Sequence, residues 1–130
     1  MITLKIITPI GLYKEGVVES VHVTTVEGET TILTDHMPIV AMLKTCKCTL
    51  QENGEKKEYA LAGGLLQFSN NEMRILTDAI EGRAEIDIQR AEKAKKRAEE
   101  RLRKKDSRTN IQRAEIALAK AMNRIRVYNN

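Results

Sequence analysis

The residues that break regular structure are confined almost entirely to the first eighty positions of the chain. Both prolines and six of the seven glycines lie there, and only Gly82 lies beyond. Glycine and proline are poor helix residues, whereas the turns between strands depend on them. The first eighty residues are therefore suited to short strands joined by turns, and the last fifty to long helices.

Short stretches rich in β-branched residues alternate with turn signals in the first part of the chain. Asn53-Gly54 is typical of a tight hairpin, and Gly63-Gly64 and Asn70-Asn71 are also predicted turns. Eight strands are predicted, at residues 4–8, 17–26, 30–33, 39–43, 45–51, 58–62, 65–69 and 73–77. Short strands at this spacing, with no helix between them, predict a β-sandwich or a small barrel.

The two cysteines, Cys46 and Cys48, lie two positions apart on a predicted strand. Their side chains therefore share one face of the strand, which is a poor geometry for a disulfide between them. No second pair of Cys or His with metal-ligand spacing accompanies them, so no metal site is predicted. We expect two buried or half-buried thiols in a reducing compartment.

Nothing in the sequence predicts a membrane span or a targeting segment. No apolar stretch reaches about 18 residues, and the N-terminus resembles neither a signal peptide nor a transit peptide. We therefore expect the chain to stay in the compartment that makes it.

The last fifty residues predict two helices that form an antiparallel hairpin. The first covers residues 88–105, with Asp87 as its N-cap. Thr109, with Gln112 three positions on, predicts a capping box at the start of the second. The apolar stripes at helical spacing consist of Ala91, Ala94, Ala98 and Leu102 in the first helix, and of Ile111, Ala114, Leu118, Ala121 or Met122, and Ile125 in the second. Alanine buries little area, so such a seam holds the hairpin together weakly.

Charge is also divided between the two parts. Residues 1–80 have a net charge of −3 and residues 81–130 a net charge of +7. A weakly held, basic hairpin suggests a switch that a bound anion would close. From composition alone, it also suggests a nucleic-acid-binding arm on a β-domain. That alternative is weakened by the acidic first part and by the presence of only four aromatic residues.

Three stretches of the chain together carry a resemblance to a known family. They are residues 28–40 (GETTILTDHMPIV), residues 61–68 (LAGGLLQF), and residues 84–91 (AEIDIQRA) with residues 113–125 (RAEIALAKAMNRI). In this order and at this spacing they resemble the epsilon subunit of the F-type ATP synthase. The resemblance runs from Leu4 to Arg126, although Thr31, Thr34 and Asp35 stand where the family usually has glycine or Pro-Gly.

The resemblance implies a β-sandwich over residues 1–82, which would bind the gamma subunit and the ring of c subunits. It implies a regulatory two-helix hairpin over residues 83–130. The chain would be a non-catalytic rotor subunit that couples proton translocation to ATP synthesis and restrains ATP hydrolysis by the alpha/beta catalytic head. It would lie on the cytoplasmic face of a bacterial cell membrane, attached only through the complex. No nucleic acid would be bound.

The resemblance also implies two sets of site residues. Glu29 and His36, expected beside one exposed turn, would contact the c-ring. A regulatory ATP would bind between the folded helices. The residues that match that nucleotide motif are Glu81, Ile86, Asp87, Arg90, Ala91, Arg97, Lys120 and Arg124. Lys120 replaces a family arginine, which keeps the charge but loses the bidentate fork.

The sequence contains no catalytic constellation. A phosphate-binding GxxxxGK[ST] loop, a GxSxG elbow and an HExxH motif are all missing. We therefore expect no active site of its own, no metal and no required cofactor, with ATP as a ligand rather than a substrate.

Overall fold

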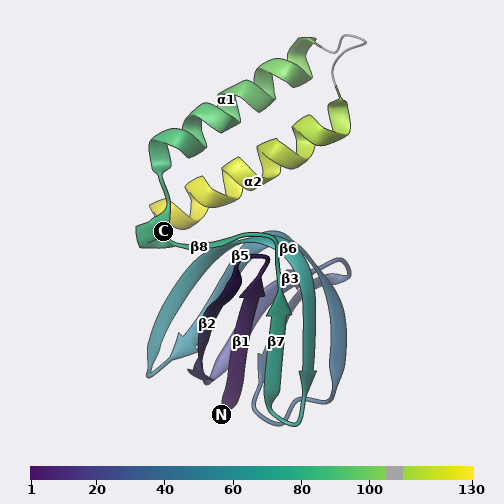
Figure 1. Ribbon diagram of the computed structural model, residues 1–130, viewed down its shortest axis with the longest axis vertical. Coiled ribbons are helices and arrows are strands. Elements are labelled where there is room, and N and C mark those ends of the chain that lie inside the picture. Colours follow the sequence, from purple (N-terminus) through teal and green to yellow (C-terminus); the bar gives the residue numbers. More distant parts are fainter. Residues whose placement is uncertain (105–109) are drawn as a thin grey trace.

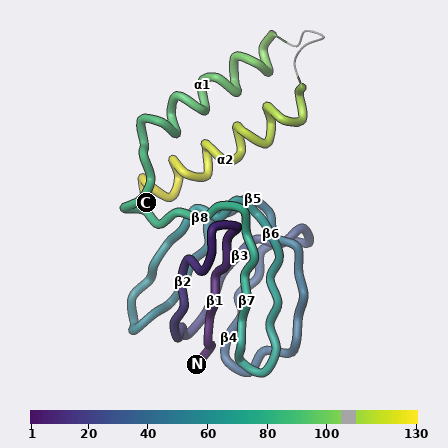
Figure 2. Tube along the Cα trace, in the orientation of Figure 1, coloured from purple at the N-terminus to yellow at the C-terminus, as the bar shows by residue number. Residues whose placement is uncertain are grey.

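The computed structural model describes residues 1–104 and 110–130, and it consists of a β-sandwich with a helical hairpin across one end (Figure 1). This confirms the predicted fold class. The N-terminus lies at the end of the sandwich far from the helices, whereas the C-terminus lies at the junction (Figure 2). The elements are β1 (Ile2–Thr8), β2 (Gly11–Val18), β3 (Ser20–Thr25), β4 (Gly28–Leu33), β5 (Ile39–Glu52), β6 (Glu55–Ser69), β7 (Glu72–Leu76), β8 (Ile80–Gly82), the 3-10 turn η1 (Arg83–Glu85), α1 (Ile88–Lys104) and α2 (Ile111–Asn129).

The strands follow the order β2-β1-β7-β6-β5-β3-β4, and β8 pairs with β6 away from this path. All neighbours are antiparallel except β1 and β7. The long hairpin of β5 and β6 curves between the two layers, so that one stretch of β6 pairs with β7 and another with β8 (Figure 1). Its turn is Asn53-Gly54, as predicted, with positive φ at both positions.

The structure contains eight strands, but they are not the eight that the sequence predicts. The predicted strand at residues 17–26 is two strands, β2 and β3, that meet at Glu19. Conversely, two predicted pairs merge, because residues 39–52 form β5 and residues 55–69 form β6 without a break. β8 was missed, since three residues are too few to show an alternation.

The predicted turn at Gly63-Gly64 is wrong, because both glycines lie inside β6. Their φ angles are +86° and +131°, and the ladder with β5 is irregular at this point. A Cβ on Gly64 would lie 2.0 Å from the carbonyl oxygen of Leu76. The two glycines therefore allow a close approach of two backbones within the sheet, as isolated glycines in strands often do.

The core of the sandwich is aliphatic and follows strand alternation. Every second residue of β1 is fully buried at Ile2, Leu4 and Ile6. Cys46 and Cys48 lie on the inward face of β5 as free, buried thiols, as predicted.

The helices begin close to the predicted positions. The Asp87 side chain accepts a hydrogen bond from the Arg90 amide (3.1 Å), which confirms Asp87 as the cap of α1. The cap of α2 is Asn110, whose side chain accepts from the Arg113 amide (3.0 Å), rather than Thr109. Thr109 itself lies outside the described residues. No helix in the described ranges is long and apolar enough to cross a membrane.

Candidate functional site

The contact between the helices is the predicted alanine seam. Ala91 and Ala98 of α1 and Ala114 and Ala121 of α2 are all buried. α2 lies between α1 and the sandwich and packs on β5 and β6, whereas α1 packs mainly on α2 (Figure 1). The outer helix is therefore held chiefly by a seam with little apolar area, and the hairpin is joined to the sandwich chiefly by α2.

Among the described residues, an ion pair and a small apolar cluster contribute to the attachment of α2 to the sandwich. The Arg124 Nε lies 2.6 Å from a carboxylate oxygen of Glu81 on β8. One turn further along the helix, Val127 is fully buried against Ala60 and Ile86. This interface is small compared with the core of the sandwich.

A third contact of α2 comes from a buried polar side chain. Asn123 donates a hydrogen bond to the carbonyl oxygen of Cys46 on β5 (2.7 Å), and its amide nitrogen lies 3.5 Å from the carbonyl oxygen of Leu61 on β6. Asparagine in the middle of a helix usually faces solvent, so the sequence pattern did not single this residue out. The only feature of the sequence that could have indicated its burial is its place directly after the stripe residues Ala121 and Met122.

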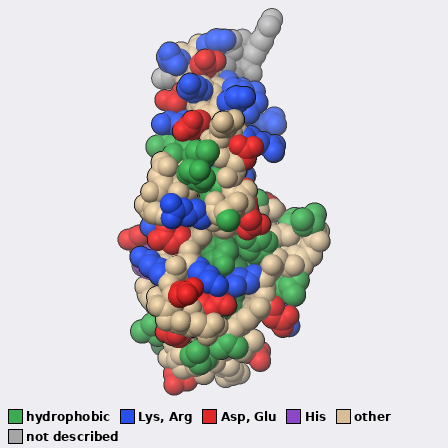
Figure 3. All heavy atoms as spheres, turned by 90° about the vertical axis from the view of Figure 1, so that its left-hand side faces the viewer, with side chains coloured by type: hydrophobic (Ala, Val, Ile, Leu, Met, Phe, Trp, Pro, Cys, Tyr) green, Lys and Arg blue, Asp and Glu red, His purple; other side chains and the backbone are tan. Residues whose placement is uncertain are grey.

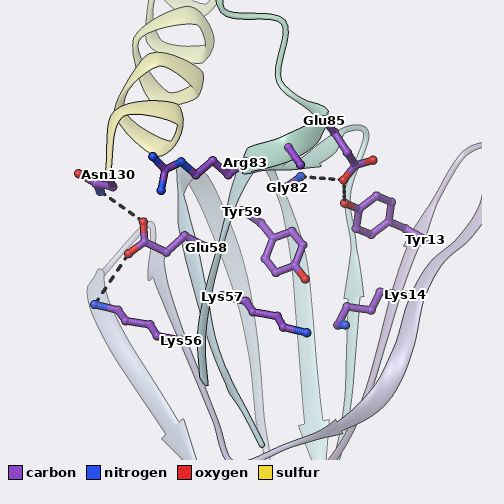
Figure 4. Close-up of a pocket in the computed structure, with 11 residues that line it drawn as sticks. Tyr13, Lys14, Lys56, Lys57, Glu58, Tyr59, Gly82, Arg83, Glu85 and Asn130 are labelled. Carbon is purple, nitrogen blue, oxygen red and sulfur yellow. Dashed lines mark hydrogen bonds and ion pairs between the residues drawn. The ribbon is translucent and has the colours of Figure 1, made fainter. Parts of the chain in front are cut away.

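The turn between β8 and α1 is fixed to the sandwich by Glu85. Its carboxylate accepts hydrogen bonds from the Gly82 amide (2.8 Å) and from the Tyr13 hydroxyl (Figure 4). Burial and the neighbouring Glu85 carboxylate raise the pKa of Tyr13 well above its usual range, so this hydroxyl remains a donor. η1 is therefore attached to the end of the sandwich, and the chain leaves the sandwich only after this turn.

An open pocket of about 670 Å³ lies beside this turn, between β2, β6 and the end of α2 (Figure 4). Lys14 and Lys57 line the pocket, and their Nζ atoms share the carboxylate of Glu52 at 3.1 and 3.6 Å. The hydrogen bond from Lys14 lowers the pKa of Glu52, although burial opposes it. Burial alone would lower the pKa of Lys14, but the contacts with Glu52 and Tyr59 outweigh it and raise that pKa. Both shifts favour the charged forms of Lys14 and Glu52.

The residues of the predicted nucleotide site lie on β8, α1 and α2 and in the link before α1, and they have different surroundings. Ile86 and Ala91 are buried packing residues, and Asp87 caps α1. Glu81 and Arg124 contact each other.

The remaining cations of that predicted site do not form one cluster. Lys120 and Arg124 line a small cavity between α2 and the sandwich. Arg90 and Arg97 are exposed on α1, and among the described residues no ion pair joins either to a carboxylate. Arg124 therefore has a carboxylate partner of its own. Of the four cations of the predicted site, only Arg90 and Arg97 are exposed.

The basic residues of the hairpin form a solvated surface. Lys93, Lys96, Arg97, Arg101 and Arg103 are exposed on α1. Lys and Arg side chains gather over the helical part of the molecule, with acidic side chains between them (Figure 3). Such a surface is suited to salt-sensitive contacts with an acidic partner.

The two predicted c-ring residues lie at opposite ends of β4, not beside one turn. Glu29 is near the start of the strand, where it pairs with Thr24 and lies 3.7 Å from the His22 ring. His36 follows the end of the strand, so roughly 13 Å or more of extended chain separates the two. The reason is that residues 28–33 form a continuous strand instead of part of a loop.

The surroundings of His36 also differ from the expectation of a freely exposed ring. The side chain is half-buried, its edge packs against Phe68 with ring centroids 6.0 Å apart, and Nδ1 bonds the Met37 carbonyl (2.7 Å). Three large apolar residues nearby in the chain are exposed: Met37 (72%), Val40 (70%) and Met42 (62%). Exposed apolar side chains that are contiguous are typical of surfaces that bind a protein partner.

Two family models match the chain and together cover nearly all of it. The model described as the beta-sandwich domain of the ATP synthase delta/epsilon chain matches residues 1–83. The model described as the long alpha-helix domain of the same chain matches residues 84–129.

Relatives and solved structures agree with these models. The chain is 47% identical to the ATP synthase epsilon chain of Clostridium novyi over 94% of this chain and 93% of the relative, and 46% identical to that of Alkaliphilus metalliredigens over 98% and 95%. A chain in the Euglena gracilis mitochondrial ATP synthase structure of OSCP, F1 and c-ring has a TM-score of 0.83 at 26% identity, covering 94% of this chain and 78% of that one. A chain in the central stalk and c-ring of the Tetrahymena thermophila mitochondrial enzyme shares the fold, with a TM-score of 0.60 at 14% identity over 98% and 93%.

Proposed function

The chain belongs to the delta/epsilon chain family of the ATP synthases, and from this premise we propose that it is a non-catalytic subunit of the rotating central stalk. In this role it couples proton translocation to ATP synthesis and restrains ATP hydrolysis. The match of both family models over nearly the whole chain is the observation that carries the proposal. It favours this function over the nucleic-acid-binding arm that composition alone left open.

The sandwich is the part that attaches to the stalk. We assign its partners as the gamma subunit and the c-ring, and the partner of the extended hairpin as the alpha/beta head. Two observations support the first assignment: the exposed apolar residues Met37, Val40 and Met42, and the assemblies of F1 with c-ring in which a similar structure is found. The chain then lies peripherally on the cytoplasmic face of a bacterial cell membrane, held there through the complex.

The hairpin is the regulatory part, because its attachments are weak enough to be reversed. Its inner seam is mostly alanine, and its attachment to the sandwich consists mainly of Val127, the Asn123 amide and the Arg124–Glu81 pair. When released, the basic face of α1 pairs with acidic segments of the catalytic head and stops hydrolysis. When docked, it does not reach them.

ATP is the proposed ligand of the docked state, held by Arg90, Arg97, Lys120 and Arg124. The structure adds one requirement, because Arg124 already contacts Glu81 at 2.6 Å. A triphosphate must share this arginine with the carboxylate or displace it. At a concentration 100-fold above its dissociation constant, a ligand of the docked state stabilises it by about 2.7 kcal/mol. That amount is sufficient to close a marginal hairpin.

Removal of residues 87–130 tests the regulatory role within the reconstituted ATP synthase. The truncated chain keeps the sandwich and the Glu85 contacts, so we expect it to assemble with gamma and to support proton-coupled synthesis. We expect hydrolysis at low ATP concentration to rise several-fold relative to the full chain in the same preparation. At millimolar ATP, where the hairpin of the full chain is docked, the two rates should be similar. Unchanged hydrolysis would remove the hairpin from regulation, and loss of assembly would contradict the assignment of the sandwich.

Thermal melting of the isolated chain with and without millimolar ATP tests the nucleotide site. We expect ATP to raise the melting temperature of the wild type and of an Arg74→Ala control, since Arg74 is exposed on β7 far from the hairpin. The Arg90→Ala variant should respond much less. Identical melting curves for the wild type with and without ATP would reject the nucleotide site and leave the family assignment intact.

A further inference from the structure

Asn123 is a buried amide in an interface that could have been apolar. Only 2% of the residue is exposed, although it is an asparagine in the middle of a helix. Its Nδ2 faces two carbonyl oxygens, of Cys46 at 2.7 Å and of Leu61 at 3.5 Å. These two residues are directly paired across β5 and β6. The amide therefore contacts one specific rung of the sheet.

The orientation of this amide is determined by its surroundings. If the side chain were turned over, Oδ1 would face the two carbonyl oxygens, and acceptor would meet acceptor. In the orientation found, Oδ1 is buried and has no hydrogen-bond partner among the described residues. The residue lines a cavity of about 10 Å³ together with Lys120 and Arg124. Docking thus satisfies the donor side of the amide, and only one orientation of the side chain does so.

The apolar contact of α2 with the sandwich depends much less on the exact register of the helix. Val127 lies one helical turn beyond Asn123 and packs into a small apolar cluster with Ala60 and Ile86. An apolar side chain is tolerated by any apolar surface, whereas a buried amide is tolerated only where its donor is met. A shift of α2 by one turn, about 5.4 Å, would place the amide against this apolar cluster without a partner.

We propose that Asn123 is the positioning residue of the hairpin: its amide selects the single register in which α2 docks on the sandwich. The ion pair of Arg124 and Glu81 nearby does not fix the register in place of Asn123. Arg124 and Glu81 have flexible side chains that can follow a moderate shift of the helix. The proposal rests on the proposed function only in that the docked hairpin is taken as one of two regulatory states.

The Asn123→Asp substitution tests the donor, because it keeps the shape of the side chain and replaces the amide nitrogen with an acceptor. The matched control is Asn129→Asp, the same change at an exposed position of the same helix. Docking is measured in the isolated full chain by the distance between spin labels at Glu27→Cys and Glu115→Cys, both exposed positions. Cys46 and Cys48 are buried and stay unlabelled.

We expect Asn123→Asp to lower the ratio of docked to undocked chains by about tenfold or more, with less than a twofold change in the control. The sandwich should remain folded, because the substitution changes no residue of the sandwich core and the hydrogen bonds of Asn123 go to backbone oxygens. Amide hydrogen exchange in β1 distinguishes undocking of the hairpin, which leaves β1 protected, from unfolding of the sandwich, which exposes it. An unchanged distance distribution in Asn123→Asp would overturn the proposal. So would a variant in which α2 stays docked until the sandwich itself unfolds.

The Asn123→Leu substitution tests the register, because it has a similar size and removes the positional requirement. We expect this variant to dock, but with a broader distance distribution or a second peak displaced by about one helical turn. One narrow peak at the wild-type distance would show that Asn123 does not select the register. These measurements need no other subunit and no ATP, so their failure is distinguishable from failure of the stalk assignment, which the truncation experiment tests.

Discussion

Among the residues that the structure describes, Arg124 and Glu81 form the ion pair between the hairpin and the sandwich, and its removal should release the hairpin measurably. The two atoms lie 2.6 Å apart, and the side chains are 32% and 30% exposed. Fully exposed pairs contribute about 0.2–1 kcal/mol, whereas hydrogen bonds to charged groups away from solvent contribute roughly 1.5–3 kcal/mol. For a pair that is one-third exposed, we expect about 1–1.5 kcal/mol, which is about five- to thirteenfold in the docking equilibrium.

A double-mutant cycle separates this pair from other effects of the substitutions. Arg124→Gln, Glu81→Gln and the double variant are compared with the wild type, with the docked fraction measured by the spin-label distance described above. Arg126→Gln is the control, since it removes the same charge at an exposed position of the same helix. Because the pair is partly exposed, its coupling energy should fall as salt is raised.

A coupling energy below about 0.3 kcal/mol, the usual error of additivity, would refute the reasoning. It would show that the pair only accompanies docking and that Val127 and Asn123 hold the hairpin. The Glu81→Gln variant also informs the nucleotide proposal. If Glu81 competes with the triphosphate for Arg124, ATP affinity should rise in this variant, whereas it should fall if Glu81 accepts from the adenine or the ribose.

Three further predictions concern the sandwich. Gly64→Ala should destabilise it by at least roughly 3 kcal/mol in thermal or urea unfolding, because the added Cβ would lie 2.0 Å from the Leu76 carbonyl oxygen; a loss below about 1 kcal/mol would contradict the close approach. Glu52→Gln should cost about 1 kcal/mol at pH 7. Since folding lowers the pKa of Glu52 from 4.5, this difference should be complete above that pH and shrink as the pH falls below it; a difference that is constant down to pH 3 would exclude the ion cluster as its source. Burial raises the pKa of Cys48 to about 12, so a thiol reagent at pH 8 should modify it only on unfolding; rapid modification of the native chain would contradict its burial.

The sequence alone determined the class of each part of this chain. The confinement of glycine and proline to the first eighty residues predicted strands there and helices beyond, and both predictions are confirmed. Alternation and helical spacing are local properties, so they also predicted the Asn53-Gly54 turn, the Asp87 cap and the alanine seam correctly. The motifs at family spacing were sufficient to identify the family.

Only the tertiary structure decided where long strands bend and what each surface contacts. Gly63-Gly64 has the composition of a turn, yet it lies within β6. Gly64 is a glycine because the neighbouring backbone at Leu76 leaves no room for a side chain. The separation of Glu29 from His36, the Arg124–Glu81 pair and the burial of Asn123 depend on segments that are distant in the chain. Periodicity shows which face of an element is apolar, but the partner of a polar side chain depends on which backbone atoms the fold brings beside it.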